Sequence, residues 1–292
     1  MSRVLIIGSD NRSTHSIGDS LSAAGVPIEY VAGPVGALQR IRMDAFAIVI
    51  TSPTTSIDED LALLKEMRLI RPAVKFIILA SHSTPEEVIA ALRAHVFACF
   101  TPPFDIQDIA SIAREAASSS LLDDDISVLS ARPGWVAVRA NCRLLTADRL
   151  MSFARELSSQ IDEFRRYEVL QGLREILLNA MEHGAAFNPD QRIDVTAVRT
   201  HRSIVFYVRD PGAGFRQELI PTDVVANPGE DPIAFMNKQK EAKQQYSGGF
   251  GLLLARGTVD ELLYSEIGNE ALLIKYLDQP PPELDRIPAL IH

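Results

Sequence analysis

The sequence has few cysteines, few lysines and no long hydrophobic run. Its two cysteines, Cys99 and Cys142, are too few for a disulfide scaffold and fit a reducing compartment. No stretch of about 18 apolar residues occurs, and the N-terminal segment lacks the apolar run and cleavage site of a signal peptide. We therefore expect a cytoplasmic protein with no membrane partner.

Basic residues are also in the minority, because 29 Lys+Arg stand against 38 Asp+Glu and give a net charge of −9. A protein that binds nucleic acid through its phosphates needs a basic surface, so we expect no nucleic-acid partner. The hydrophobic share of 47% is ordinary for a globular chain, and 292 residues are enough for two domains. Three of the six lysines, Lys238, Lys240 and Lys243, fall within six residues.

Residues 1–119 alternate short apolar runs with helical patterns. Near-continuous apolar runs separated by helices are typical of parallel strands that are buried on both faces of a sheet. The pattern predicts an α/β flavodoxin-like (βα)5 domain with a parallel sheet and helices on both sides. The expected strands are Val4–Ile7, Ile28–Val31, Phe46–Ile50, Phe76–Leu79 and Val96–Phe100.

The order of elements then changes. Residues 120–134 contain serines, an aspartate triplet and a Pro-Gly pair, which predict a linker. Residues 135–278 follow as a strand, two long helices, a hairpin, an irregular stretch, a helix and a last hairpin. This order predicts an α+β two-layer sandwich, with residues 279–292 as a tail. The expected helices are Ala147–Gln160, Phe164–His183 and one that begins at Gly251, and the expected strands are Trp135–Arg143, Ile193–Val198, Ser203–Val208, Leu262–Ser265 and Ala271–Tyr276.

By the order of its strands and helices, the first domain resembles the receiver domain of two-component response regulators. The resemblance implies an acidic pair for Mg²⁺ after the first strand, a phosphoryl-accepting aspartate after the third and a lysine after the fifth. Gly8 and Ser9, Thr51, and Pro102 stand at those positions, and only Asp10 remains near the metal position. One carboxylate is a poor Mg²⁺ site. We therefore expect a pseudo-receiver that serves as an interaction or dimerisation module.

Two other interpretations of the first domain stay open. It is either an unrelated flavodoxin-like domain, or it carries a small-molecule site at the carboxyl ends of its strands, near Ser9, Ser52 and Ser81.

The second domain carries three separated motifs. Glu175, Asn179 and His183 stand at i, i+4 and i+8, so they share one face of a predicted helix. Residues 210–215, D-P-G-A-G-F, form a glycine-rich turn after a predicted strand. Residues 247–254, S-G-G-F-G-L-L-L, place glycines at a helix start, where free N–H groups suit phosphate. Taken singly, each motif has an ordinary explanation as a solvated helix face or a turn.

In this order and on these elements, the three motifs match the N, G1 and G2 boxes of the GHKL, or histidine-kinase-like, ATPase superfamily. Within it, residues 135–277 resemble the anti-sigma-factor serine/threonine kinases. The text that carries this likeness is N-A-M-E-H-G, then G-L-L-L-A-R-G-T-V-D-E-L, then Gly268-Asn269-Glu270. The resemblance implies binding of ATP and Mg²⁺ and phosphorylation of a serine or threonine on a protein substrate.

The resemblance also implies roles for single residues. Asp210 accepts a hydrogen bond from the adenine amino group, because a carboxylate offers only acceptors. Gly212 and Gly214 let the backbone approach the base and the ribose. Asn179 offers its amide oxygen to Mg²⁺, which takes its remaining oxygens from water and phosphate. Glu175 is the candidate general base.

Other candidates surround the phosphates. Gly248, Gly249 and Gly251 are expected to approach them through backbone N–H groups. His183 is a candidate contact to the nucleotide, with a structural role at the helix end as the alternative. Lys243 lies in the long loop between the second and third motifs, where the lysine cluster serves either as a cationic lid or as a solvated helical face.

We compare three candidate functions for the whole chain. The first is a kinase of the anti-sigma type, with an antagonist protein as substrate, a partner such as a sigma factor, and a homodimeric state. The second is an ATP-dependent adaptor with little phosphate transfer. The third, a sensor histidine kinase, is not expected because no histidine lies between His95 and His183 to accept phosphate.

Overall fold

The computed structural model describes residues 3–8, 11–118, 125–214 and 250–278. Its first domain is a five-stranded parallel sheet with the strand order β2-β1-β3-β4-β5 and helices on both faces. This is the flavodoxin-like order, so the predicted fold class of the first domain is confirmed. Its elements are β1 (Val4–Ile7), α1 (Arg12–Ala23), β2 (Ile28–Val31), α2 (Pro34–Met43), β3 (Ile48–Ile50), α3 (Ile57–Ile70), β4 (Lys75–Leu79), α4 (Pro85–Arg93), β5 (Ala98–Phe100) and α5 (Ile106–Ser118).

The parallel strands are buried on both faces because helices cover each side. In β1, Val4 and Ile6 pack with α1 and α5, whereas Leu5 and Ile7 pack with α2, α3 and α4. The sequence also fixes where helices begin. For example, Thr84 forms a capping box with Glu87 at the start of α4.

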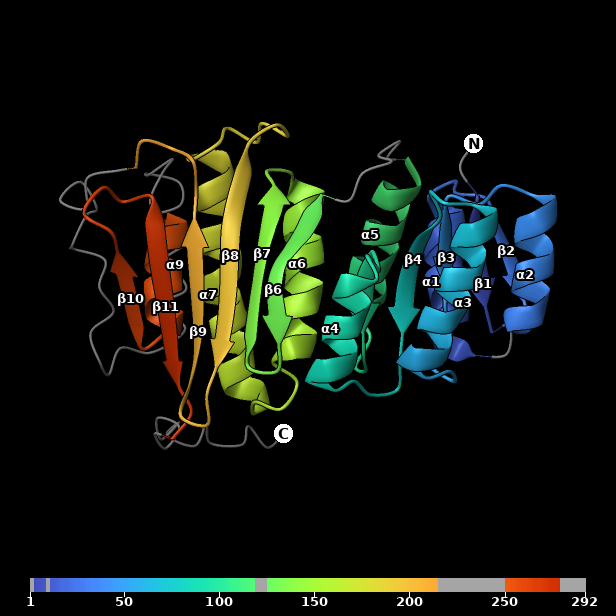
Figure 1. The fold of residues 1–292 in the computed structure, drawn as a ribbon, viewed down its shortest axis with the longest axis horizontal. Coiled ribbons are helices and arrows are strands. Elements are labelled where there is room, and N and C mark those ends of the chain that lie inside the picture. The colour runs from blue at the N-terminus through green and yellow to red at the C-terminus, as the bar shows by residue number, and fades with distance from the viewer. Residues whose placement is uncertain (1–2, 9–10, 119–124, 215–249, 279–292) are drawn as a thin grey trace, which may run out of the picture.

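The second domain is a six-stranded antiparallel sheet with the order β10-β11-β9-β8-β7-β6. Helices α6, α7 and α9 cover one face, which makes the predicted two-layer α+β sandwich (Figure 1). Along β7, every second side chain is buried against these helices, as at Val136 and Val138. The elements are β6 (Ile126–Arg132), β7 (Trp135–Asn141), α6 (Leu144–Leu157), α7 (Glu163–Glu182), β8 (Arg192–Arg199), β9 (Ser203–Arg209), α9 (Phe250–Thr258), β10 (Glu261–Tyr264) and β11 (Glu270–Tyr276).

One prediction about the chain between the domains is wrong. Residues 126–132 form the edge strand β6, not part of a linker, and Pro133-Gly134 is the tight turn that joins β6 to β7. The turn needs glycine, because Gly134 has a φ of +77°. A β-bulge between Val128 and Ser130 breaks the alternation of buried and exposed residues. Because of this break, the alternation of apolar and polar residues that predicts a strand is disturbed in β6.

The two domains share a buried interface in which α6 packs against α4, β5 and α5 (Figure 1). Two charged side chains of α6 enter the first domain. Glu156 is 1% exposed, and its Oε1 accepts from the Thr101 N–H at 3.0 Å. Its Oε2 accepts from the Thr101 and Ser83 hydroxyls at 2.8 and 2.9 Å. The Arg149 guanidinium donates from Nε to the Phe97 carbonyl at 2.9 Å.

Replacing Glu156 with alanine is expected to lower the free energy of unfolding by about 2 to 4 kcal/mol, because it leaves three half-buried donors of Thr101 and Ser83 without an acceptor. Urea denaturation followed by circular dichroism measures the change. Glu182→Ala is the matched control, since Glu182 is exposed on α7. Equal denaturation midpoints for the two variants would show that Glu156 does not hold the domains together.

Among the described residues, none of the helices combines the length and the apolar character that crossing a bilayer requires. Cys99 and Cys142 are both buried free thiols in the cores. The structure therefore contains no disulfide among the residues that it describes.

Candidate functional site

Helix α7 carries the first group of predicted site residues. Asp162 caps its start by accepting from the Arg165 N–H at 3.0 Å. Ile176 and Ala180 face the core, and the opposite face carries Glu175 and Asn179, which are half-buried. The sequence pattern thus predicts this face correctly, because apolar residues at helical spacing decide which side of α7 is buried.

Helix α9 meets α7 at these two polar side chains. Gly251 lies so close to Glu175 that a Cβ on Gly251 would overlap the Glu175 carboxylate and lie 3.7 Å from Nδ2 of Asn179. A second glycine, Gly172, makes the same approach possible one turn earlier on α7, where a Cβ would lie 2.9 Å from Oγ1 of Thr258. The first turn of α9, with its free N–H groups, is therefore held beside a carboxylate and an amide.

Asp210 lies directly after β9 and is fixed by its own turn. Its N–H donates to the Asn269 carbonyl at 3.0 Å, and its Oδ1 accepts from the Gly212 N–H at 2.8 Å. Burial raises the pKa of Asp210 above its ordinary value, and the Gly212 N–H opposes that shift. The carboxylate is thus oriented and only partly solvated, which suits the recognition of a single donor group.

Two glycines bring Asp210 against the end of α7. A Cβ on Gly184 would overlap the Asp210 carboxylate, and a Cβ on Gly212 would lie 2.8 Å from both Oδ1 of Asp210 and Cα of Gly184. The second glycine of the motif, Gly214, has a φ of +77° and packs against the Ile267 carbonyl. These positions tolerate no side chain, which explains the glycines of the motif physically.

The structure therefore brings together Glu175, Asn179 and Gly251 at one point along α7, and Asp210 and Gly212 at another. Gly184 follows Asn179 by five positions and Glu175 by nine, so the two points lie roughly 8 to 13 Å apart along the helix axis. An elongated ligand that ends in an amine at one side and in phosphates at the other matches this spacing.

A metal ion at this site would need a bound molecule to supply part of its coordination. Among the described residues, no group of three or more His, Cys, Asp and Glu side chains could hold a metal ion. Asn179 offers one amide oxygen, which fits Mg²⁺, because that ion keeps several waters and is usually held through one or two side chains plus phosphates. The donor set thus fits Mg²⁺ brought with a triphosphate.

For several of the predicted site residues, the structure does not test the predicted role. Gly248, Gly249 and Lys243, with the rest of the lysine cluster, lie outside the described residues. His183 is the C-cap of α7, where its N–H donates to the Asn179 carbonyl at 2.8 Å, and it is exposed. Its place at the helix end accounts for a structural role, and contact with a nucleotide remains untested.

In the first domain, the position that would accept a phosphoryl group is buried. Thr51 follows β3, is fully buried, and its Oγ1 accepts from the Leu79 N–H at 3.1 Å. Pro102 follows β5 where the lysine was expected, and Ser9 and Asp10 lie outside the described residues. Thr51 thus links β3 to β4, and its hydroxyl does not face solvent.

Asp60, on α3 beside Thr51, is the one buried carboxylate of the first domain among the described residues. Burial raises its pKa to about 6, although hydrogen bonds from Thr51 and Thr55 lower it. The folded state therefore holds this proton more tightly than the unfolded chain, so the contribution of Asp60 to stability is fully present below about pH 4 and is lost as the pH rises through about 6.

Asp60→Asn is therefore expected to raise the free energy of unfolding at pH 7.5 by about 1 to 3 kcal/mol, since a shift of one pKa unit corresponds to about 1.4 kcal/mol. The gain should shrink as the pH falls and vanish near pH 4. Denaturant titrations of both proteins at a series of pH values measure this. A difference that does not change with pH would refute the raised pKa. Exposed Asp58, on the same helix, provides the control Asp58→Asn.

A protein-family model matches most of the second domain. Residues 138–275 match the family model of the histidine kinase-like ATPase domain. The match begins in β7 and ends in β11, so it includes Glu175, Asn179, Asp210 and Gly251. This region is therefore a histidine-kinase-like ATPase domain. No curated protein matches the sequence.

The solved structures that are similar to part of this chain include several receiver domains and response regulators. A CheY-like receiver domain protein from Methanospirillum hungatei JF-1 has 22% identity over 40% of this chain and 94% of its own, with a TM-score of 0.37. A response regulator from Thermotoga maritima has 17% identity over 41% of this chain and 100% of its own, also with a TM-score of 0.37. An orphan response regulator of H. pylori has 14% identity over 40% and 96%, with a TM-score of 0.36.

Proposed function

We propose that this chain is a regulatory protein that binds ATP with Mg²⁺ and transfers phosphate to a serine or threonine of a partner protein. The observation that carries the proposal is the contact of Glu175 and Asn179 with Gly251, together with Asp210 at the end of the same helix. These residues come from three segments far apart in sequence, within the part that matches a histidine kinase-like ATPase domain.

In the proposed complex, Asp210 accepts a hydrogen bond from the adenine amino group through Oδ2, while Oδ1 stays on the Gly212 N–H. The closely packed turn at Gly212 and Gly214 presents its backbone to the base. At the other end, Asn179 binds Mg²⁺ through its amide oxygen, and the first turn of α9 donates N–H groups to the phosphates. Held there by Asn179, Mg²⁺ would help to offset the charge on the phosphate oxygens.

Glu175 is the proposed general base. Its carboxylate lies beside the start of α9, where the terminal phosphate would end, so it can accept the proton of a serine or threonine hydroxyl as that oxygen attacks phosphorus. The bond from phosphorus to the bridging oxygen breaks, and ADP leaves. Without a protein substrate, the same carboxylate would orient water for slow hydrolysis.

The proposed partners are an antagonist protein that is phosphorylated and a regulator, such as a sigma factor, that is bound. We further propose that the protein acts as a homodimer in the cytoplasm and that its first domain serves these interactions without receiving phosphate. The buried Thr51 supports that last point, since its hydroxyl is engaged within the sheet.

A pull-down with the full chain, with and without Mg-ATP labelled at the γ-phosphate, tests the proposal. We expect a bound protein to acquire labelled phosphoserine or phosphothreonine, and Glu175→Gln to abolish the label. A label on histidine or aspartate, or label that persists in Glu175→Gln, would contradict the proposed reaction.

A second function, an ATP-dependent adaptor with little phosphate transfer, is favoured by the buried contacts of Glu156 and Arg149 between the domains. Such an interface makes the first domain a fixed scaffold for the ATPase-like domain. Partner capture that depends on ATP, with no phosphate transferred, would select this function over the kinase.

A further inference from the structure

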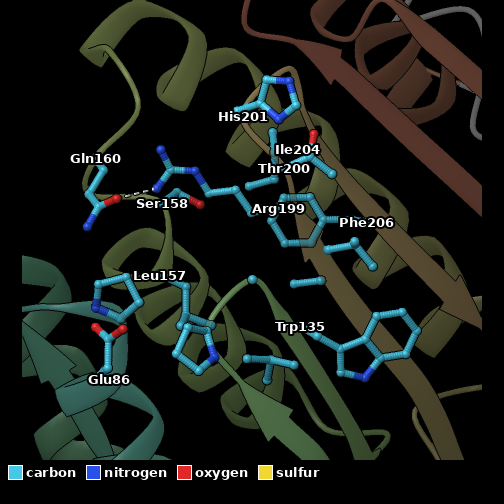
Figure 2. A pocket seen from close by; sticks show the side chains of 16 residues that line it. Glu86, Trp135, Leu157, Ser158, Gln160, Arg199, Thr200, His201, Ile204 and Phe206 are labelled. Atoms are coloured by element: carbon cyan, nitrogen blue, oxygen red, sulfur yellow. Dashed lines mark hydrogen bonds between the residues drawn. The ribbon is translucent and has the colours of Figure 1, made fainter.

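A pocket lies at the opposite end of the second domain from the proposed nucleotide site. It has a volume of about 350 Å³, within the range of small-molecule sites. The β6–β7 turn, the β8–β9 turn and the end of α6 form it, and Pro85 and Glu86 of α4 add a wall from the first domain (Figure 2). Ile204, near the start of β9, lines it, whereas Asp210 follows the other end of that strand, roughly 20 Å away.

The inner part of the pocket is apolar. Phe206, Ile204 and Val136 line it and are buried, and Leu157 lines it as well. Trp135 lines the edge of the same space and is 38% exposed, but by the alternation along β7 its indole ring lies on the face of the sheet opposite Val136. An apolar group that binds here would be shielded from water by aliphatic and aromatic side chains, which favours an apolar ligand.

A buried hydroxyl lines this space. Ser158 is fully buried, and its Oγ has no hydrogen-bond partner among the described residues. Its own N–H is engaged by the carbonyls of Ala154 and Arg155, so the side chain alone lacks a partner. An unpaired buried hydroxyl is costly, and a ligand atom that accepts its proton would relieve that cost.

The pocket also contains a cationic side chain, Arg199. Arg199 is half-buried and donates from Nη1 to Oε1 of Gln160 at 2.9 Å, as the dashed line in Figure 2 shows. Within the described part of the chain, no carboxylate forms an ion pair with it; Glu86, the acid on the opposite wall, is exposed to solvent. The guanidinium has five N–H groups, and the one that donates to Gln160 holds it in place. Others remain to bind a planar anion in a bidentate manner.

We propose that this pocket binds a small carboxylate with an apolar body. The carboxylate lies between the Arg199 guanidinium and the Ser158 hydroxyl, and the body lies on Phe206, Val136 and Leu157. Because α4 forms one wall, the ligand touches both domains and stabilises their contact. The proposal does not depend on the nucleotide chemistry.

The test follows ligand binding to the full-length protein by isothermal titration calorimetry. The full-length protein is titrated with 4-phenylbutyrate, and with the neutral 4-phenylbutyramide as the matched probe. We expect a saturable heat of binding with the acid and at least about tenfold weaker binding of the amide, because the amide forms no ion pair. Equal binding of the two probes, or no saturable heat of binding with the acid, overturns the proposal.

Two pairs of variants locate the site. Ser158→Ala and Arg199→Gln should weaken 4-phenylbutyrate binding by about threefold and at least tenfold, respectively. Their controls are Ser159→Ala, which removes a neighbouring buried hydroxyl outside the pocket, and Arg202→Gln on the adjacent turn. Ser158→Ala should also raise the melting temperature of the free protein, since it removes an unpaired hydroxyl. Loss of binding in the controls as large as in Ser158→Ala and Arg199→Gln would refute the assignment.

Discussion

Glu175→Gln is expected to reduce phosphate transfer by about 10²- to 10⁴-fold, the usual contribution of a positioned general base. Glutamine has the same shape, so it can occupy the space against Gly251 without moving α9, but it cannot accept a proton. ATP affinity should therefore change by less than about threefold. Single-turnover assays with labelled ATP measure the transfer, and equilibrium titration measures the affinity.

The control for this variant is Glu182→Gln, at the exposed end of the same helix, which should behave as the wild type. Transfer that continues at the wild-type rate in Glu175→Gln would remove Glu175 from the chemistry. A combined loss of transfer and of ATP affinity would instead show that the variant disturbs the packing of α7 on α9.

Asp210→Asn is expected to weaken ATP binding by about 10- to 100-fold, because a hydrogen bond to a charged group contributes roughly 1.5 to 3 kcal/mol. The amide nitrogen of asparagine presents a donor where the adenine amino group also donates. The wild type should prefer ATP to GTP, since guanine carries an acceptor at that position, and Asp210→Asn should reduce this preference. Fluorescent nucleotide displacement with both nucleotides measures the two effects.

The raised pKa of Asp210 adds a pH dependence to the same experiment. Because burial raises this pKa, protonation of the carboxylate competes with adenine binding at a higher pH than for an exposed aspartate. ATP affinity should thus fall as the pH is lowered from 7 towards 5 in the wild type and change less in Asp210→Asn. Asp190→Asn, at an exposed loop position, is the control. Identical pH profiles for wild type and Asp210→Asn would contradict the role of this carboxylate.

How far the sequence predicts the fold depends on which interactions decide each element. Helix α7 begins within one residue of the predicted position, Phe164, because a local cap at Asp162 and a regular apolar face determine it. Strand β6 escapes prediction because its bulge disturbs the local pattern and its pairing with β7 supplies the stability.

In the candidate site, too, some features follow from local sequence spacing and others depend on the packing of distant segments. Glu175 and Asn179 share a helix face that spacing alone predicts. The overlap of Gly251 with Glu175, and of Gly184 with Asp210, depends on how distant segments pack and has no local signal. Glu156 escapes sequence reasoning for the same reason, because Thr101, its main partner, lies 55 positions earlier and in the other domain.

The most direct test of the account is a crystal structure of the full chain with Mg²⁺ and a non-hydrolysable ATP analogue. The account predicts the adenine amino group within hydrogen-bond distance of the Asp210 carboxylate, the phosphates at the first turn of α9, and the ion on the amide oxygen of Asn179. A nucleotide bound elsewhere, or one whose phosphates lie away from Glu175 and Gly251, would contradict it.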